Sequence, residues 1–325
     1  MSDVFILGAG FSRAVAQEMP LLADLSAAVW SKVPEEKVFL HSFGGNIEMA
    51  LTYLSQSHPW MAEAENLRNR ALFLDLASAV REVLLDSMRK AAQRPCPQWL
   101  LSLIHYWEST QAQVITLNYD TLVESAARLC TQVYFAGLLP DRYYPFPMTP
   151  LRREWEEFSL RSYKSDPASF RLFKLHGSIN WLYSGSVSPG AETVYYAALD
   201  DVWRPSPVLE LGVTDKTPLI VPPVAEKVVY FQHPHVRGMW REAAAAVKCA
   251  TRVFCLGYSL PDLDITMRFF LNRNHPGNST PFLLVDLRDL SDHFREMLPQ
   301  HVYDLDSLYV RPDDPVPTFA DRLVH

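Results

Sequence analysis

The chain has 325 residues, of which 48% are hydrophobic and 21% charged, and its formal net charge is −7. This is the composition of a globular protein, and the acidic balance argues against a dedicated nucleic-acid-binding protein, which usually carries a basic excess. The sequence contains no apolar run of about 18 residues and no signal-peptide pattern. We therefore expect a cytoplasmic protein that binds neither membrane nor nucleic acid directly.

Strands alternate with helices along the chain. Strands are predicted at 3–8, 113–117, 169–177, 218–224, 252–256 and, as the last strand, 280–289. Helices are predicted at 20–30, 46–92, 99–110, 121–129, 233–250 and 265–274. This alternation predicts an α/β fold with a mostly parallel sheet. We expect a single domain over 1–325, with a helical layer or subdomain inserted at about 30–110. The C-terminal tail, 291–325, is expected to end in a short docking helix.

Two further features of the composition bear on function. In the most basic stretch, 152–174, the basic residues alternate with acidic ones, which is typical of a solvated helical face.

The cysteines form no C-x-x-C pair, so neither a zinc site nor a disulfide framework is predicted, and buried free thiols are expected. They are Cys96, Cys130, Cys249 and Cys255.

The first predicted strand runs into a glycine turn, Gly8-Ala9-Gly10, followed by Phe11 and Ser12. Glycines let the backbone approach a pyrophosphate closely, and amide groups at a helix start favour anions. The next position holds an arginine where a dehydrogenase fingerprint needs a small residue, and no acidic strand end follows about 20 residues on. The pattern predicts a phosphate-binding turn other than that of a dehydrogenase. A plain strand–helix turn is the alternative.

Asn118 and Asp120 follow the strand at 113–117. The carboxyl ends of parallel strands are where open α/β sheets bind ligands. Asparagine offers both a donor and an acceptor to ribose hydroxyls. Both residues also cap helices well, so a purely structural role is the alternative, and the two roles are compatible.

His176 stands in KLHGSINW, at a predicted strand end and directly before a glycine. A histidine in this position suits a general base near neutral pH. The alternative is a histidine that is hydrogen-bonded for structure alone.

Two later strand ends carry polar turns. Gly257 and Ser259 predict a second close approach of the backbone to a nucleotide, and Asp262 and Asp264 suit a helix cap. Asp286 ends the strand at 280–289 and is a candidate to contact an adenosine ribose or adenine. An ordinary strand-end aspartate is an equal alternative.

In this order, the motifs GAGFS, LNYD, KLHGS and GYSLPD, followed by an acidic strand end, resemble the sirtuin-like (SIR2) superfamily. They are most similar to the SIR2-like NADase domains of bacterial antiphage defence systems, and the resemblance covers about residues 4–290. It implies a Rossmann-like core that binds NAD as a substrate and cleaves its nicotinamide–ribose bond. It implies that the NAD phosphates bind to Gly8, Ala9, Gly10 and Ser12, and that the nicotinamide ribose binds to Asn118. It also implies that His176 is the catalytic base. The distal nucleotide-binding turn would contain Gly257 and Ser259. Asp120 would support the developing positive charge or only hold its loop.

Two departures from the family select the reaction. Protein-deacylating sirtuins carry a zinc module with two C-x-x-C pairs and a GIPDFR-type segment. Here the cysteine pairs are missing, and only Pro20 of EMPLLADL is reminiscent of the segment. We therefore expect hydrolysis of NAD to nicotinamide and ADP-ribose, or to the cyclic product, without a metal. The alternatives are a sensor or scaffold subunit that binds NAD or ADP-ribose without turnover, and a zinc-less deacylase.

The resemblance also implies regulation, because unchecked NAD hydrolysis kills the host. It implies the toxic effector of abortive infection, controlled by homo-oligomer assembly or by a partner such as an ATPase or helicase, a short Argonaute or a phage protein. Two aromatic-rich segments, 141–148 and 228–240, are either interfaces or core.

Overall fold

The computed structural model describes residues 2–33, 42–130, 143–146, 149–150, 169–184, 193–197, 202–203, 216–221, 233–277, 280–298, 304–307 and 314–324. Within these ranges no helix is long and apolar enough to cross a membrane.

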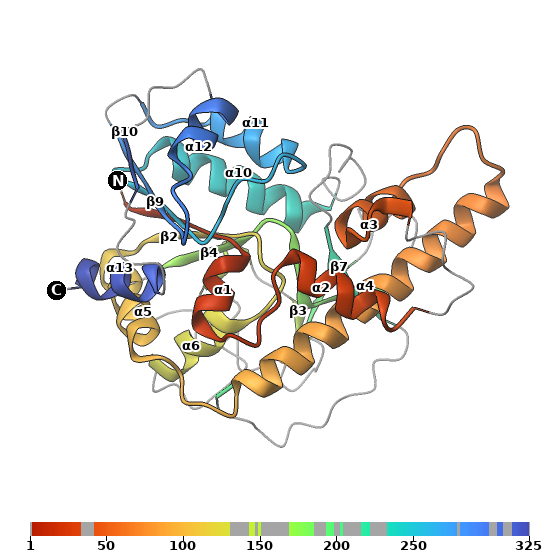
Figure 1. Cartoon of the computed structure of the whole chain (residues 1–325), viewed down its shortest axis with the longest axis horizontal. Helices are drawn as coiled ribbons and strands as arrows, with labels where there is room; N and C mark the ends of the chain where they lie inside the picture. Colours follow the sequence, from red (N-terminus) through yellow and green to blue (C-terminus); the bar gives the residue numbers. More distant parts are fainter. Residues whose placement is uncertain are drawn as a thin grey trace.

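A six-stranded parallel sheet lies at the centre of the molecule (Figure 1). Its strands, in spatial order, are β10 (Asp304–Ser307), β9 (Pro281–Val285), β8 (Val253–Leu256), β1 (Val4–Leu7), β2 (Gln113–Thr116) and β4 (Arg171–Lys174). The chain builds one half outward from β1 through β2 to β4, and then the other half from β8 to β10. This is the doubly wound order of Rossmann folds, so the predicted α/β fold with a mostly parallel sheet is confirmed. The strand order reverses between β1 and β8.

The central strands form because their sequences suit burial on both faces. VFIL in β1 and VFCL in β8 are apolar throughout and fully buried. Parallel strands covered by helices on both sides read as continuous apolar runs rather than as alternating ones. Phe5 and Phe254 stack between these two strands, with ring centroids 4.8 Å apart.

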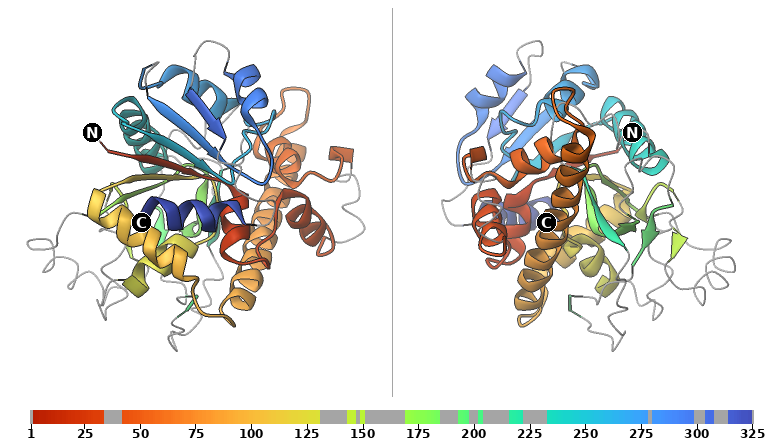
Figure 2. Two further views of the ribbon diagram at one scale, coloured as in Figure 1. Left: turned by 60° about the vertical axis from the view of Figure 1, so that its left-hand side comes forward. Right: turned by 90° about the vertical axis from the view of Figure 1, so that its right-hand side faces the viewer.

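Helices cover both faces of the sheet (Figure 2). One face carries α1 (Ala9–Val15), α5 (Gln98–Thr110), α6 (Leu122–Cys130) and α13 (Pro315–Val324), and the other carries α10 (Pro234–Lys248), α11 (Ile265–Arg273) and α12 (Ser291–Met297). The short helix expected in the tail is α13. Between the first two strands lie α2 (Leu22–Trp30), α3 (Ile47–Ser55), α4 (Glu63–Ala91) and α5. The single helix predicted over 46–92 is wrong in one respect: residues 56–62 are not helical and separate α3 from α4.

A second sheet, which was not predicted, has the order β3-β6-β5-β7. Its strands are β3 (Thr149–Pro150), β5 (Gly177–Tyr183), β6 (Tyr195–Tyr196) and β7 (Thr217–Ile220). The predicted end of the third strand, at His176–Gly177, is wrong: β4 ends at Lys174, and β5 starts at Gly177. Gly177 has a φ of +80°, and a Cβ there would lie 1.9 Å from the carbonyl oxygen of Leu219, so the turn between the sheets requires glycine.

Other sequence expectations also need correction. β10 follows the strand that was expected to be the last one. Lys174, assigned to a solvated helical face, is fully buried in β4, and residues 152–168 of that stretch lie outside the described residues. All four cysteines are free thiols, but only Cys255 is buried; Cys96 and Cys130 are half-buried and Cys249 is exposed. Of the aromatic segments, Tyr143 and Tyr144 are buried. Residues 141–142, 147–148 and 228–232 lie outside the described residues.

A polar cluster joins the strands at the amino edge of the central sheet. The Asp3 carboxylate accepts hydrogen bonds from Thr251 Oγ1 (3.1 Å), Arg252 Nε (3.0 Å) and the Tyr106 hydroxyl (2.8 Å). Burial acts to raise the pKa of Asp3, but the hydrogen bonds from Arg252 and Tyr106 outweigh it and leave the pKa below its ordinary value. Asp3 thus ties the start of β1 to β8 and to α5.

Candidate functional site

The predicted site residues lie along the carboxyl edge of the central sheet. Leu7, Thr116, Lys174, Leu256 and Val285 are in register, each at the carboxyl end of its strand. The residues directly after β1, β8 and β9 are Gly8, Gly257 and Asp286. The residues two positions after the ends of β1, β2 and β4 are Ala9, Asn118 and His176. Because the register is shared, residues that are far apart in the sequence lie side by side at the ends of five adjacent strands, whose order is β9-β8-β1-β2-β4.

The glycine turn contacts the rest of the protein more closely than expected. Gly10 N donates to Gly257 O (2.9 Å), Gly8 N to Leu256 O (3.1 Å), and Phe11 N to Gly8 O (3.0 Å). Gly257, with a φ of +58°, lies against Gly8 and Gly10 so tightly that a Cβ on any of the three would collide with backbone atoms. The glycines are therefore required for packing of the β8 turn on the start of α1.

Within this turn, Ala9 is exposed, whereas Gly8, Phe11 and Ser12 are buried. The Phe11 ring packs edge-on to Trp99, with centroids 5.8 Å apart, so its side chain lies in the core. Only its backbone belongs to the turn that the sequence predicts to bind phosphate.

A chain of hydrogen bonds joins three predicted residues, Asn118, Ser12 and Asp120. Asn118 Nδ2 donates to Gly8 O (2.8 Å) and to Ser12 Oγ (2.9 Å), and Ser12 Oγ donates to Asp120 Oδ2 (2.6 Å). Asp120 Oδ1 also accepts from Leu122 N (3.1 Å) at the start of α6. Asp120 thus holds the helix start and the Ser12 hydroxyl together, and Asn118 is only half-buried at the outer end of the chain.

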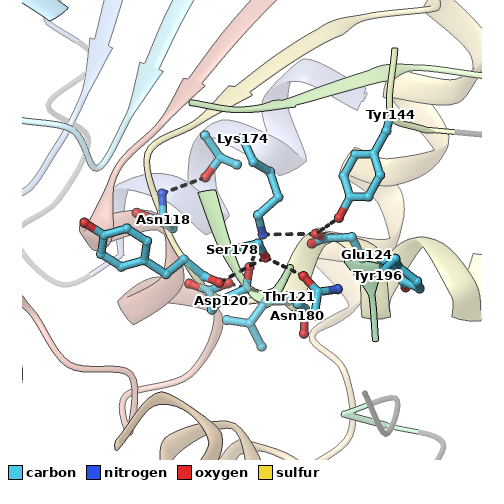
Figure 3. A network of polar contacts seen from close by, with 12 residues as sticks. Asn118, Asp120, Thr121, Glu124, Tyr144, Lys174, Ser178, Asn180 and Tyr196 are labelled. Atoms are coloured by element: carbon cyan, nitrogen blue, oxygen red, sulfur yellow. Dashed lines mark hydrogen bonds and ion pairs between the residues drawn. The ribbon is translucent and has the colours of Figure 1, made fainter. Parts of the chain in front are cut away.

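Behind Asp120 lies a buried charged network that the sequence analysis did not identify (Figure 3). Lys174 from β4 donates to the backbone oxygen of Asp120 and pairs with Glu124 Oε1 at 3.0 Å. Tyr144 donates its hydroxyl to the same Glu124 oxygen at 2.7 Å. The signal in the sequence is a lysine between the apolar residues Phe173 and Leu175 at the end of a strand, since a lysine is almost never fully buried without a partner.

The pKa values of this network follow from its burial. Burial raises the pKa of Asp120, and the positive charge of Lys174 and the Ser12 hydrogen bond oppose that rise. Burial and the neighbouring Glu124 carboxylate raise the pKa of Tyr144 well above its usual range, so the phenol stays protonated and donates.

His176 lies in the short turn between β4 and β5 and is 3% exposed. Its ring is tilted toward the rings of Tyr119 and Trp240, with centroids 6.4 and 6.5 Å away. Its carbonyl oxygen accepts from Val221 N (2.8 Å), and Trp240 Nε1 donates to Leu175 O (3.1 Å). Both contacts fix the backbone on either side of the imidazole.

The two remaining strand ends are also ordered. Ser259 is half-buried, and Leu260 adopts a φ of +49°, which is uncommon for a residue other than glycine and marks local strain. Asp264 caps α11 by accepting from Met267 N (3.2 Å), as predicted. Asp286 is half-buried, accepts from Arg288 N (3.2 Å), and has its pKa raised by burial.

No protein-family model matches this chain, and neither does any curated protein. Among solved structures, Sir2Tm bound to a propionylated peptide aligns over 99% of this chain and 91% of its own, with a TM-score of 0.45 and 15% sequence identity. A complex of Sir2 with a p53 peptide and NAD+ aligns over the same shares, with a TM-score of 0.44 and 15% identity. At these values the similarity carries no functional conclusion.

Proposed function

We propose that this chain binds NAD+ across the carboxyl edge of its central sheet and hydrolyses the nicotinamide–ribose bond, giving nicotinamide and ADP-ribose. The observation that supports this most strongly is the shared register of the predicted residues past five adjacent strands. In doubly wound sheets, the point where the strand order reverses is the usual place for a dinucleotide. Here that point lies between Gly8 and Gly257.

The spacing of the strands fits a ligand as long as an extended dinucleotide. Asp286 and His176 follow strands that are four positions apart in the sheet. At about 4.8 Å for each position, they mark out a span of about 19 Å. In this proposal the adenosine end lies toward Asp286, the phosphates near Ala9 and Ser259, and the nicotinamide ribose between Asn118 and His176.

The proposed chemistry needs positioning more than reactive groups. Nicotinamide is a cationic leaving group, so cleavage through an oxocarbenium-like state depends mainly on orientation and charge stabilisation. Asn118 orients the ribose and the attacking water, and His176 removes a proton from a ribose hydroxyl or from that water. Asp120 is engaged with Ser12 and Leu122, so its role here is to hold the turn.

Nicotinamide release tests the proposal. The purified chain is incubated with NAD+, and nicotinamide is quantified by chromatography. His176→Ala and Asn118→Ala are each expected to lose at least about a hundredfold in rate, which is typical of a missing general base or orienting group. His105→Ala, an exposed position on α5, is the matched control and should retain wild-type activity. Full activity in both site variants would refute the assignment.

Two alternatives give distinct results in the same experiment. Tight NAD+ binding without turnover, also in the presence of candidate partners, would favour a sensor or scaffold. Release of nicotinamide that depends on an acylated peptide would favour a deacylase.

The biological part of the proposal comes from the motif resemblance. We infer a single-domain effector of abortive infection, with the helical segment at about 30–110 as an insertion, gated by oligomer assembly or by a partner protein. Bacteria that express the wild-type chain should lose NAD+ on phage infection, and cells that express His176→Ala should not. Equal NAD+ loss in both strains would refute this role.

A further inference from the structure

The hydrogen bonds from Asn118 to Asp120 have a defined direction. Asn118 Nδ2 has two protons, and it donates to two acceptors, Gly8 O and Ser12 Oγ. A serine hydroxyl has only one proton to donate, and that of Ser12 goes to Asp120 Oδ2. The serine oxygen therefore accepts from Asn118, and the Asn118 amide oxygen faces away from the chain of hydrogen bonds.

This direction depends on a negatively charged Asp120. A carboxylate only accepts, whereas a protonated carboxyl donates its own proton and could reverse the Ser12 hydroxyl. Asp120 is buried, and burial disfavours the charged form. Two charged groups act on it. Lys174 on β4 donates to the backbone oxygen of Asp120, and its positive charge favours the carboxylate; Glu124 on α6, paired with Lys174 at 3.0 Å, opposes it. Ser12 on α1 and the Leu122 amide add hydrogen bonds to the charged form.

We propose that Lys174 is a positioning residue for the proposed NAD site: through Asp120 and Ser12 it fixes which way the Asn118 amide faces. The inference rests on the proposed function for its substrate. It adds that the ligand group at Asn118 must be a hydrogen-bond donor, that is, a ribose hydroxyl or the attacking water. Lys174 does not touch the substrate and acts only through the two intervening side chains.

Stability alone is a weak explanation for this lysine. Lys174 is fully buried, and its partner Glu124 is nearly so. Replacing a buried ion pair with neutral residues of similar size is often neutral or stabilising, because both charges are costly to desolvate. A change that removes both charges therefore separates positioning from folding.

The test is a double-mutant cycle. One arm is Lys174→Met/Glu124→Gln, which keeps side-chain volume and leaves an acceptor for the Tyr144 hydroxyl. The other arm is Ser12→Ala, and the third protein combines both. We expect each arm to lower kcat for nicotinamide release by about tenfold or more, as a misplaced orienting group does. If Lys174 acts through Ser12, the combined variant is no slower than the worse arm.

Two results would overturn the inference. Multiplying effects in the combined variant would mean that the two sites act independently. Wild-type kcat in a folded Lys174→Met/Glu124→Gln protein would mean that the charge is not needed. The matched control is Lys32→Met/Glu82→Gln, which removes an exposed ion pair of 3.2 Å and should leave kcat unchanged. Circular dichroism and melting temperature show that each protein is folded.

A parallel NAD+ titration separates failure of this inference from failure of the proposed function. If the wild type binds NAD+ but releases no nicotinamide, hydrolysis is refuted. The same double-mutant cycle, measured as dissociation constants for NAD+, then decides the role of Lys174. If the wild type cleaves NAD+ and the cycle is additive, only the Lys174 inference fails. If the wild type neither binds nor cleaves NAD+, both are overturned.

Discussion

Replacing Gly257 with alanine is expected to destabilise the protein strongly, because this residue is where the β8 turn meets the glycine turn. A Cβ on Gly257 would lie 2.3 Å from Phe11 N and 2.4 Å from Gly10 C. These are backbone atoms, which cannot rotate away as a side chain can. The two turns would have to separate.

The magnitude follows from three contributions. The φ of +58° is left-handed and costs a residue with a Cβ roughly 1 kcal/mol. Forcing an extra carbon into a packed contact typically costs about 1–3 kcal/mol. Separation of the turns also weakens the Gly10 N to Gly257 O hydrogen bond of 2.9 Å, worth about 1 kcal/mol. Together these contributions predict a loss of about 3–5 kcal/mol. With an unfolding entropy of about 2.1 cal/mol/K per residue over 325 residues, the melting temperature should be lower by roughly 4–7 °C.

Gly44→Ala is a matched control that isolates the contact. Gly44 has a φ of +63°, close to that of Gly257, but no atom lies within 4 Å of an added Cβ. It should therefore show only the backbone cost of roughly 1 kcal/mol. Calorimetry or thermal melting of both variants measures the difference. Equal melting temperatures for the two would refute the reasoning, since they would show that the turns are not in tight contact.

Three further predictions concern other parts of the fold. Asp3→Asn should destabilise the protein at pH 7. The pKa of Asp3 is lowered in the folded state, so the Asp3 carboxylate stabilises the fold above the ordinary carboxyl pKa of about 4. This stabilisation is lost as the pH falls through the folded-state pKa. Urea unfolding should therefore show the stabilities of the two proteins becoming equal in acid. Asp264→Ala should cost at least about 1 kcal/mol, because it removes both the α11 cap and the acceptor of the buried Tyr258 hydroxyl (2.8 Å), seen as a lower urea midpoint; an unchanged midpoint would contradict both contacts. A thiol reagent should modify Cys249 in the folded protein but Cys255 only after unfolding, because Cys255 is buried and burial raises its pKa; rapid labelling of Cys255 would contradict this.

Much of the central sheet could be predicted from short apolar runs next to polar turns. VFIL and VFCL are buried on both faces, and each is followed directly by a glycine. Such a pattern is local, so it can be read without the fold. The position of Asn118 past its strand was likewise predictable, whereas the strand predicted at His176 extended past its true end at Lys174. Their shared register was not, because it depends on which strands are neighbours.

The features that were missed depend on distant partners. Gly177 interrupts an otherwise continuous strand pattern only because its turn lies against Leu219. β10, with the sequence DLDS, has no apolar run and lies at the edge of the sheet. Lys174 is buried because Glu124, 50 residues away, supplies the opposite charge. No local pattern in the sequence identifies these distant partners.

The central place of β1 has a consequence for how the chain acquires its fold. Asp3 bonds to Tyr106, 103 residues away, and to Arg252, 249 residues away, and β1 itself pairs only with β2 and β8. Ribosomes add about 5–20 residues per second, so the strand waits roughly 12–50 s for β8 to be synthesised. During that time a fully apolar segment lacks at least one of its two neighbours, and until β2 is synthesised it lacks both. We therefore expect nascent chains that end before β8 to recruit chaperones and those that include it to be released.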